Sequence, residues 1–278
     1  MRRLDPMSRV CILTDNTAQF TRTDFPGREH VYLVPFDLET VETQGKDPIR
    51  SVFSGQRLVP PSDQVFLQQY QDLAARYDSI LVLTISALLS PALSNALSAR
   101  ARFHNPARVE VVDSRTTSIG LGWLVAEAAT AICAGESLGT LVKRVNTASG
   151  RIFFLFFIPE MDALAINGHL SHAQALVADI LGILPIFLLE EGRLAPLEKA
   201  RSQRAVLEYF VEFLDEFETP ADVALVHGRK VPAGRMQPIR QHIQEIHPQA
   251  LLSEQVLTPA LEALLGAQSF GMAILQKG

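Results

Sequence analysis

The first half of the chain alternates short apolar runs with segments of helical periodicity. Four apolar runs have the length and continuity of buried strands: residues 10–14, 31–35, 79–85 and 108–113. Three segments carry helical spacing or a strong helix start: residues 62–76, 90–103 and 120–134. Strands and helices in this order predict parallel βαβ units. The polar segment 37–62, rich in glycine and proline, predicts mostly loop and edge structure.

Near residue 150 the pattern changes. Further strands are predicted at a phenylalanine-rich run and at later apolar runs: residues 151–158, 183–188, 223–227, 251–253 and 270–275. Helical periodicity covers three more segments: residues 161–181, with a break at Asn167-Gly168, residues 199–217 and residues 234–246. We therefore predict an α/β protein of two domains. Residues 1–150 would form a mainly parallel, Rossmann-like sheet flanked by helices, and residues 151–278 a smaller C-terminal α/β domain with a mixed sheet.

Composition narrows the class of partner. The 278 residues carry a formal net charge of −5, and 47% are hydrophobic. Nucleic acids and anionic membranes are bound by concentrated basic surfaces, which this charge balance does not indicate. Residues 1–6 lack the apolar run of a signal peptide, and the apolar run at residues 152–158 is far shorter than the ~20 residues that span a bilayer. We expect a cytoplasmic protein with no nucleic-acid partner and no integral membrane segment.

The usual motifs of catalysis and metal binding are missing from the sequence. There is no G-x-S-x-G elbow, P-loop, G-x-G-x-x-G or H-E-x-x-H. Cys11 and Cys133 fall in apolar patterns and are predicted to be small buried core residues. His169 and His172 are three residues apart but have no third ligand at a useful spacing. We therefore predict no catalytic residue, no metal and no cofactor.

Polar side chains follow three of the predicted strands, at Asp15-Asn16-Thr17, Ser86 and Asp113-Ser114. Ligands of parallel sheets bind outside the carboxyl ends of the strands, although loops there also use polar residues for turns and caps. Ser90 precedes Pro91 at a helix start. Its hydroxyl either caps the helix alone or also contacts an anion, with the amide of Ala92 as the first donor. The residues alone leave both interpretations open.

Several of these segments resemble the motifs of the DegV family. Thr14-Asp15-Asn16-Thr17 is similar to the family's T-D-S-T-like strand end, and residues 34–36 to its V-P-L-like strand end. Residues 86–92, Ser-Ala-Leu-Leu-Ser-Pro-Ala, resemble S-S-x-L-S-G-T, and residues 113–122 match D-S-x-x-x-S-x-G-x-G in full. Three further segments resemble T-S-Q-P-S, G-G-R-I and H-x-G-P-G-x-x-G, in that order: residues 58–62, 167–170 and 264–271.

The resemblance implies a protein that holds a long-chain fatty acid in a tunnel between its two domains. In some family members the fatty acid is presented to a fatty-acid kinase. Ser90 matches the family's carboxylate-binding serine, whereas Leu58 stands in place of a carboxylate-binding threonine. Leu264 replaces a C-terminal histidine and His169 replaces an arginine. Because a buried methylene is worth about 0.8 kcal/mol and a lost hydrogen bond to a carboxylate costs ~1.5–3 kcal/mol, we expect lipid binding with reduced selectivity for a free acid.

The predicted function is therefore the non-catalytic binding of a long-chain fatty acid or a related lipid. The polar end of the lipid is assigned to Ser90 and the amide of Ala92. The rest of the binding site is assigned to four residues: Leu58, Val59, Leu264 and Gly266. Two alternatives remain open. The first is a regulatory or scaffolding paralogue whose pocket has closed, and the second is an enzyme acting on a small phosphorylated metabolite, since the wider fold is related to that of dihydroxyacetone-type kinases.

Overall fold

The computed structural model describes residues 9–44 and 52–277, so the start at residues 1–6 and part of segment 37–62 lie outside the described residues. The chain divides into two compact units. Unit 1 comprises the chain up to Phe36 together with Pro60–Gly150, and unit 2 comprises Asp37–Val59 together with the chain from Arg151. The sequence-based division places residues 37–59 in the N-terminal domain, whereas the structure counts them in unit 2. Unit 2 is consequently the larger of the two and not the smaller.

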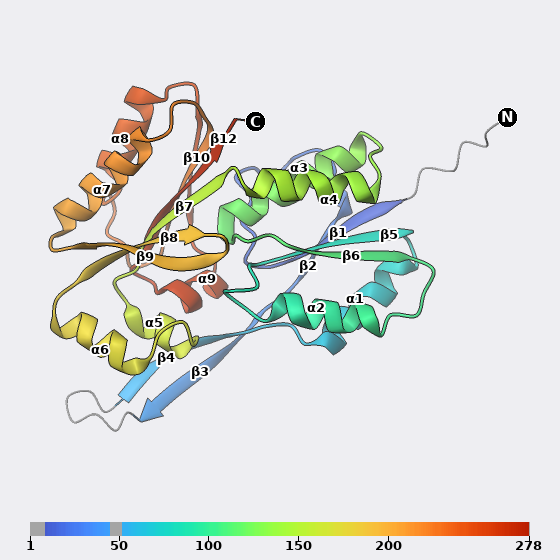
Figure 1. Ribbon diagram of the computed structural model, residues 1–278, viewed down its shortest axis with the longest axis horizontal. Coiled ribbons are helices and arrows are strands. Elements are labelled where there is room, and N and C mark those ends of the chain that lie inside the picture. The colour runs from blue at the N-terminus through green and yellow to red at the C-terminus, as the bar shows by residue number, and fades with distance from the viewer. Residues whose placement is uncertain (1–8, 45–51, 278) are drawn as a thin grey trace. The chain divides into compact units, whose positions relative to one another are not determined.

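Unit 1 is a parallel sheet between two layers of helices (Figure 1). Its strand order is β2-β1-β5-β6, with these bounds: β1 Val10–Asp15, β2 Val31–Val34, β5 Ser79–Thr84 and β6 Arg108–Asp113. The helices are α1 Asp63–Ala74, α2 Ala92–Ala101, α3 Ser118–Cys133 and α4 Leu138–Ser149, with a short 3-10 helix η1 at Arg28–His30. Helices α1 and α2 cover one face of the sheet, and α3 and α4 cover the other. The predicted parallel sheet flanked by helices is confirmed.

The core of unit 1 follows from the continuous apolar runs of β1 and β5, which are buried along their whole length. Alternate residues such as Cys11 and Val82 pack against Phe66 and Tyr70 of α1. The hydroxyl of Tyr70 donates a hydrogen bond to the carbonyl oxygen of Ala96 at 3.0 Å, which ties α1 to α2. The two central strands therefore hold the loops at their carboxyl ends in fixed positions.

Unit 2 contains a mixed six-stranded sheet of order β11-β10-β12-β7-β8-β9 and a separate hairpin, β3-β4. The strands are β3 Asp37–Gln44, β4 Val52–Val59, β7 Ile152–Phe157, β8 Leu184–Glu190, β9 Arg193–Ala200, β10 Pro220–His227, β11 Leu251–Val256 and β12 Phe270–Gln276. The helices are α5 Met161–Ile166, α6 His172–Ile180, α7 Gln203–Asp215, α8 Gln237–Ile246 and α9 Pro259–Leu265. Strands β10 and β11 pair in parallel and the other neighbours in the six-stranded sheet are antiparallel, which confirms the predicted mixed sheet.

The side chains of strand β7 point alternately to the two faces of this sheet. Leu155 and Phe157 of β7 pack in one cluster with Phe210 of α7 and Ile239 of α8. Because side chains alternate along a strand, Phe154 and Phe156 point to the opposite face, where their rings stack with centroids 4.0 Å apart. Within the part of the chain that the structure describes, no helix is both long and apolar enough to cross a membrane.

The segment predicted as mostly loop and edge structure forms the hairpin β3-β4 wherever it is described. The two strands pair antiparallel from Asp37 opposite Val59 to Gln44 opposite Val52. The side chains of residues 37–40 are all exposed. A strand that is exposed on both faces lacks the apolar alternation of a half-buried strand, so the sequence pattern could not reveal it.

Three other elements depart from the sequence-based prediction. Strand β9 occupies residues where helix was expected from residue 199, and α7 begins only at Gln203. Strand β9 pairs with β8 in a hairpin, because Glu191 (φ 46°) and Gly192 (φ 84°) adopt the left-handed conformation of a two-residue turn. Pro196 fits in β9 because this strand lies at the sheet edge. Helices α4 and α9 have no predicted counterpart; α9 has only seven residues and is buried throughout its last six, so it shows no amphipathic period.

Candidate functional site

Asp15, at the end of β1, is fully buried and holds the first strand-end loop together. Its Oδ1 accepts hydrogen bonds from the N–H of Thr17 at 3.0 Å and the hydroxyl of Thr17 at 2.5 Å. Its Oδ2 accepts the N–H of Ile85 at 2.7 Å. Burial raises the pKa of the Asp15 carboxyl, and these hydrogen bonds partly oppose that shift. Both carboxylate oxygens are used by the protein itself, which favours the structural interpretation of this strand end.

The strand ends after β5 and β6 are likewise tied to each other. Oδ1 of Asp113 accepts the N–H groups of Ala87 at 3.2 Å and Arg115 at 2.9 Å. The N–H of Ser86 donates to the carbonyl oxygen of Thr116 at 2.9 Å. The polar residues that resemble a ligand cluster in the sequence therefore shape loops in the structure. Hydroxyl and carboxylate groups engaged in this way are poorly available for catalysis.

Ser90 is buried directly before α2 in unit 1. Its Oγ accepts the N–H of Ala92 at 3.3 Å, and the N-cap residue of α2 is Pro91, one position later than predicted. Among residues 9–44 and 52–277, no side chain or carbonyl accepts the proton of the Ser90 hydroxyl. A bond of 3.3 Å is long for N–H···O. An anionic oxygen can therefore replace Oγ as the acceptor for Ala92 and receive the hydroxyl proton of Ser90.

In unit 2, Asn167 joins the elements that carry the predicted site residues Leu58 and Leu264. Its Oδ1 accepts the N–H of Leu58 at 2.8 Å. Its Nδ2 donates to the carbonyl oxygens of Ala263 at 2.8 Å and Ala163 at 2.9 Å. One side chain thus fixes the end of β4, helix α5 and helix α9 relative to one another. Both leucines are buried, and Val59 follows Leu58 at the end of β4.

Gly266 follows α9 and lies against Glu160. A Cβ atom at Gly266 would come within 2.6 Å of Glu160 Oε2, so the missing side chain makes room for that carboxylate. Glu160 accepts hydrogen bonds from the backbone N–H and the side-chain amide of Gln268, at 2.9 and 3.1 Å. Nearby, Glu262 is buried and accepts the backbone N–H and the guanidinium of Arg229, each at 2.6 Å.

These residues line a pocket of ≈ 760 Å³ in unit 2. Two further carboxylates, Asp162 and Asp179, belong to the same wall. Two cations, Arg229 and Lys230, line the pocket as well, so the four carboxylates outnumber the cations and a fatty-acid carboxylate would meet a net negative charge. The position of Gly266 is explained by its contact with Glu160, and its role toward a ligand stays a prediction.

A second pocket in unit 2, of ≈ 640 Å³, is mainly apolar and lies between the α5-α6 segment and strands β8 and β9. Its apolar wall includes Met161, Leu164, Leu170, Val177, Phe187 and Leu194. His169, which stands where related sequences are expected to have arginine, also lines it. The apolar surface extends along α6, where Val177 is 53% exposed, Ile180 60% and Leu181, just beyond the helix, 65%. Pockets of about 300–1,000 Å³ with apolar walls are typical of small-molecule sites.

No local pattern in the sequence indicates this apolar pocket. Its residues come from two helices, two strands and the segments between them, and each apolar position taken singly is typical of core. One local signal is that the apolar residues 177, 180 and 181 are exposed. An amphipathic helix that packs on one side would have polar residues at its exposed positions. The prediction that Cys133 is buried is wrong, because this residue is exposed, whereas Cys11 is buried as predicted.

Comparisons with known proteins agree with this architecture. A family model described as "Uncharacterised protein, DegV family" matches residues 9–277. A DegV domain-containing protein of Staphylococcus aureus (strain MRSA252) is 22% identical over 285 residues, which cover 98% of this chain and 100% of the relative. A fatty-acid-binding DegV family protein of Thermus thermophilus superposes with a TM-score of 0.79 at 22% identity, covering 97% of this chain and 100% of its own.

A third relative is the Fatty Acid Kinase B3 protein of Streptococcus pneumoniae, whose structure was determined loaded with linoleic acid. It superposes with a TM-score of 0.76 at 19% identity and covers 97% of this chain and 100% of its own. At such identities the structural likeness establishes the fold alone. The family model spans nearly all of the described chain, and on that basis the protein belongs to the DegV family.

Proposed function

We propose that the protein binds one long-chain fatty acid or a related lipid and catalyses no reaction on it. The observation that carries this proposal is the apolar pocket of ≈ 640 Å³ in unit 2. It is supported by the family match over residues 9–277 and by the descriptions of the relatives from T. thermophilus and S. pneumoniae as fatty-acid-binding or fatty-acid-loaded proteins.

Burial of an acyl chain in this pocket supplies enough free energy for binding. Each buried methylene contributes about 0.8 kcal/mol, so about twelve buried methylenes supply on the order of 10 kcal/mol before the costs of association. Leu164, Phe187 and Leu194 give the pocket apolar walls, and four polar residues also line it: His169, Gln174, Glu198 and Lys199. The main driving force is therefore hydrophobic and depends on chain length.

The polar end of the lipid is assigned to Ser90 and the N–H of Ala92 in this proposal. Their long mutual hydrogen bond of 3.3 Å leaves both groups able to exchange it for bonds to a ligand oxygen. Leu58 and Leu264 stand where the family motifs have a threonine and a histidine, so the side-chain donors of those two residue types are missing at both positions. We therefore propose weak discrimination between a free acid and an uncharged derivative.

The proposal extends to delivery of the lipid. The relative from S. pneumoniae is named the Fatty Acid Kinase B3 protein, and we propose by analogy that this protein presents its bound acid to a fatty-acid kinase in the cytoplasm. Release of a phosphorylated acyl product from the loaded protein, in the presence of ATP and a fatty-acid kinase, would support that role. Retention of the acid by the protein under the same conditions would contradict it.

A displacement assay tests the binding function. The purified full-length protein, stripped of endogenous lipid, is loaded with a fluorescent long-chain fatty acid and titrated with palmitate, methyl palmitate and octanoate. We expect palmitate and methyl palmitate to displace the probe at similar concentrations and octanoate to require at least about 100-fold more, because it loses eight methylenes. Failure of the probe to bind would indicate a closed pocket, and equal potency of octanoate would contradict a hydrophobic acyl site.

A further inference from the structure

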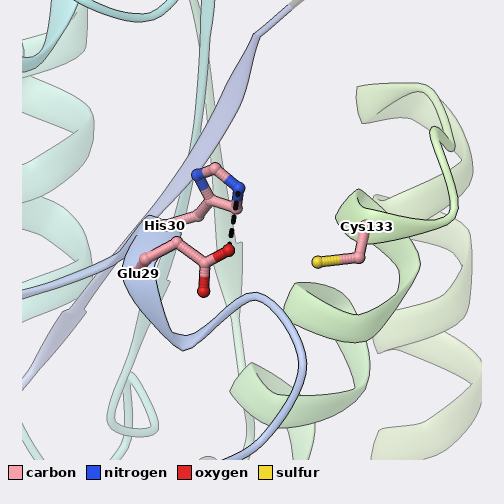
Figure 2. A group of neighbouring side chains, drawn as sticks. All are labelled: Glu29, His30 and Cys133. Carbon is pink, nitrogen blue, oxygen red and sulfur yellow. Dashed lines mark ion pairs between the residues drawn. The ribbon is translucent and has the colours of Figure 1, made fainter.

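In unit 1, three side chains that can bind a metal lie close to one another: Glu29, His30 and Cys133. One ligand atom from each lies within 4.8 Å of those of the other two. Figure 2 shows that Glu29 and His30 extend from η1, while the thiol of Cys133 points toward them from the end of α3. Glu29 and His30 are adjacent, but Cys133 lies far from them in the sequence, so no spacing motif indicates the cluster. It is also separate from every residue assigned above to lipid binding.

The fold itself places these side chains together. Gly27, the N-cap residue of η1, has φ 80°, and a Cβ atom there would lie 2.3 Å from the carbonyl oxygen of Ala129 in α3. Glycine therefore permits an approach of η1 to α3 that any side chain would prevent. Ala129 and Cys133 are four residues apart and occupy the same face of α3. The close contact at Ala129 consequently brings the residues after Gly27 next to Cys133.

The ligand atoms are not committed to strong interactions elsewhere. His30 Nε2 is 3.7 Å from Glu29 Oε1, which is too long for a hydrogen bond. Within residues 9–44 and 52–277, the Cys133 thiol has no hydrogen-bond partner. The ring of His30 packs edge-on against Tyr77, with centroids 6.1 Å apart and an interplanar angle of 88°, and this contact holds the imidazole in place. A cation between the three groups would satisfy all of them together.

The set of donors selects a class of metal. A thiolate, an imidazole and a carboxylate are the ligands that proteins offer to Zn²⁺, at about 2.3 Å for sulfur and about 2.0–2.2 Å for nitrogen and oxygen. Tetrahedral geometry with these bonds separates ligand atoms by about 3.4–3.8 Å. The cluster must contract by roughly 1 Å from its 4.8 Å limit, and Glu29 and Cys133 can do so by side-chain rotation because both are exposed.

The surroundings of the cluster also favour a cation. Cys133 is the last residue of α3, and the carboxyl end of a helix carries a partial negative charge. Glu29 and Cys133 line a pocket of ≈ 450 Å³, which also includes Asp24. The pocket gives an ion and a water molecule access to the cluster, so three protein ligands leave one coordination position open to solvent.

From this geometry we infer that Glu29, His30 and Cys133 form a binding site for Zn²⁺, with water as the fourth ligand. The bound ion would link η1 to α3 on the surface of unit 1. Thiolate and imidazole together disfavour Mg²⁺ and Ca²⁺, which require oxygen ligands.

Titration of the metal-free, reduced full-length protein with Co²⁺ tests the site, because cobalt takes the place of zinc and reports thiolate ligation through a charge-transfer absorption band. We expect one equivalent of Co²⁺ to produce the band and one equivalent of Zn²⁺ to abolish it. Cys133→Ser should eliminate the band, although Cys11 is still present. His30→Gln and Glu29→Gln should each weaken binding by at least about 10-fold, since even groups outside the ligand set contribute that much.

His104→Gln serves as the matched control, because His104 is an exposed histidine outside the cluster. It should bind Co²⁺ as the unaltered protein does, and circular dichroism should show that every variant is folded. A band that persists in Cys133→Ser, or equal weakening by His104→Gln and His30→Gln, would overturn the inference. Absence of the band from the unaltered protein at millimolar Co²⁺ would do the same.

Discussion

The strand ends of unit 1 and the apolar pocket of unit 2 differ in how their side chains are used. At the strand ends, the carboxylates of Asp15 and Asp113 accept hydrogen bonds from neighbouring loop groups. In unit 2, mainly apolar side chains line an open pocket of ≈ 640 Å³. The carboxylates at the strand ends thus take part in the fold, whereas this pocket of unit 2 offers mainly apolar surface to a ligand.

This difference separates catalysis from binding. Catalytic carboxylates must reach the reacting atoms of a substrate, and Asp15 is buried with hydrogen bonds to both of its oxygens. Asp113 accepts two backbone N–H groups on Oδ1 alone. An apolar cavity requires no reactive group and binds an acyl chain through burial alone. The comparison therefore favours a carrier of lipid, and it can be challenged on each side.

The largest effect is expected from Asp15→Ala. The substitution leaves the buried N–H groups of Ile85 and Thr17 without an acceptor, at a cost of ~1–3 kcal/mol for each. Urea denaturation should show that the free energy of unfolding falls by about 3 kcal/mol or more. Asp24→Ala, at an exposed position, is the control and should change it by less than about 0.5 kcal/mol. A loss below about 1 kcal/mol for Asp15→Ala would contradict the structural role of the strand end.

The next effect concerns the pocket and uses two leucines of strand β9. Leu194 lines the apolar pocket, whereas Leu197 does not and is 42% exposed. Leu194→Asp places a charge among apolar groups and beside the acyl chain, so the affinity for palmitate should fall by about 100-fold. Leu197→Asp should leave it within about twofold of the unaltered protein. Equal affinities for the two variants in the displacement assay would show that lipid binds elsewhere.

A smaller effect is expected at the polar end. Ser90→Ala removes one donor to a ligand oxygen, and a hydrogen bond to a charged group is worth ~1.5–3 kcal/mol, so the affinity for palmitate should fall by at least about 10-fold. The affinity for methyl palmitate should change less, because its carbonyl oxygen is uncharged. Ser94→Ala is the control on the same helix, since the hydroxyl of Ser94 donates to its own turn, at the carbonyl oxygen of Pro91. Equal losses in Ser90→Ala and Ser94→Ala would remove Ser90 from the site.

The smallest change is a difference in cysteine reactivity. Burial raises the pKa of the Cys11 thiol to about 12, so the reactive thiolate of Cys11 forms only as the pH approaches that value. Cys133 is exposed. Iodoacetamide at pH 8 should therefore add one label to the folded, metal-free protein and two to the urea-unfolded protein. Two labels on the folded protein would show that the core around Cys11 opens readily.

The parts of the fold that the sequence predicts are those where one local signal dominates. The continuous apolar runs of β1, β5 and β6 indicate buried parallel strands, and Ser62 marks the start of α1, where its Oγ accepts the N–H of Val65. The hairpin β3-β4 escapes prediction because the side chains of residues 37–40 contact solvent on both faces of β3, and its order comes from backbone pairing. Cys133 is misjudged because an alanine-rich helix does not show which face is buried.

The candidate site divides in the same way. Ser90 is recognisable because a serine before a proline at a helix start is a local pattern, and the structure finds it buried there. The apolar pocket and the Glu29-His30-Cys133 cluster depend on residues brought together only by folding. Asn167 holds Leu58 and the last turn of α9 through hydrogen bonds between residues far apart in the sequence; Asn167 and Ala263 are 96 positions apart. No pattern in a single sequence reveals such contacts.

The most direct test of lipid binding is mass spectrometry of an organic extract from the purified, denatured protein. The account predicts a long-chain lipid in a ratio of about one per chain, as a free fatty acid or with an altered headgroup, and its loss from Leu194→Asp but not from Leu197→Asp. A preparation of folded protein that carries no lipid, and that takes up none when a long-chain fatty acid is supplied, would contradict the account.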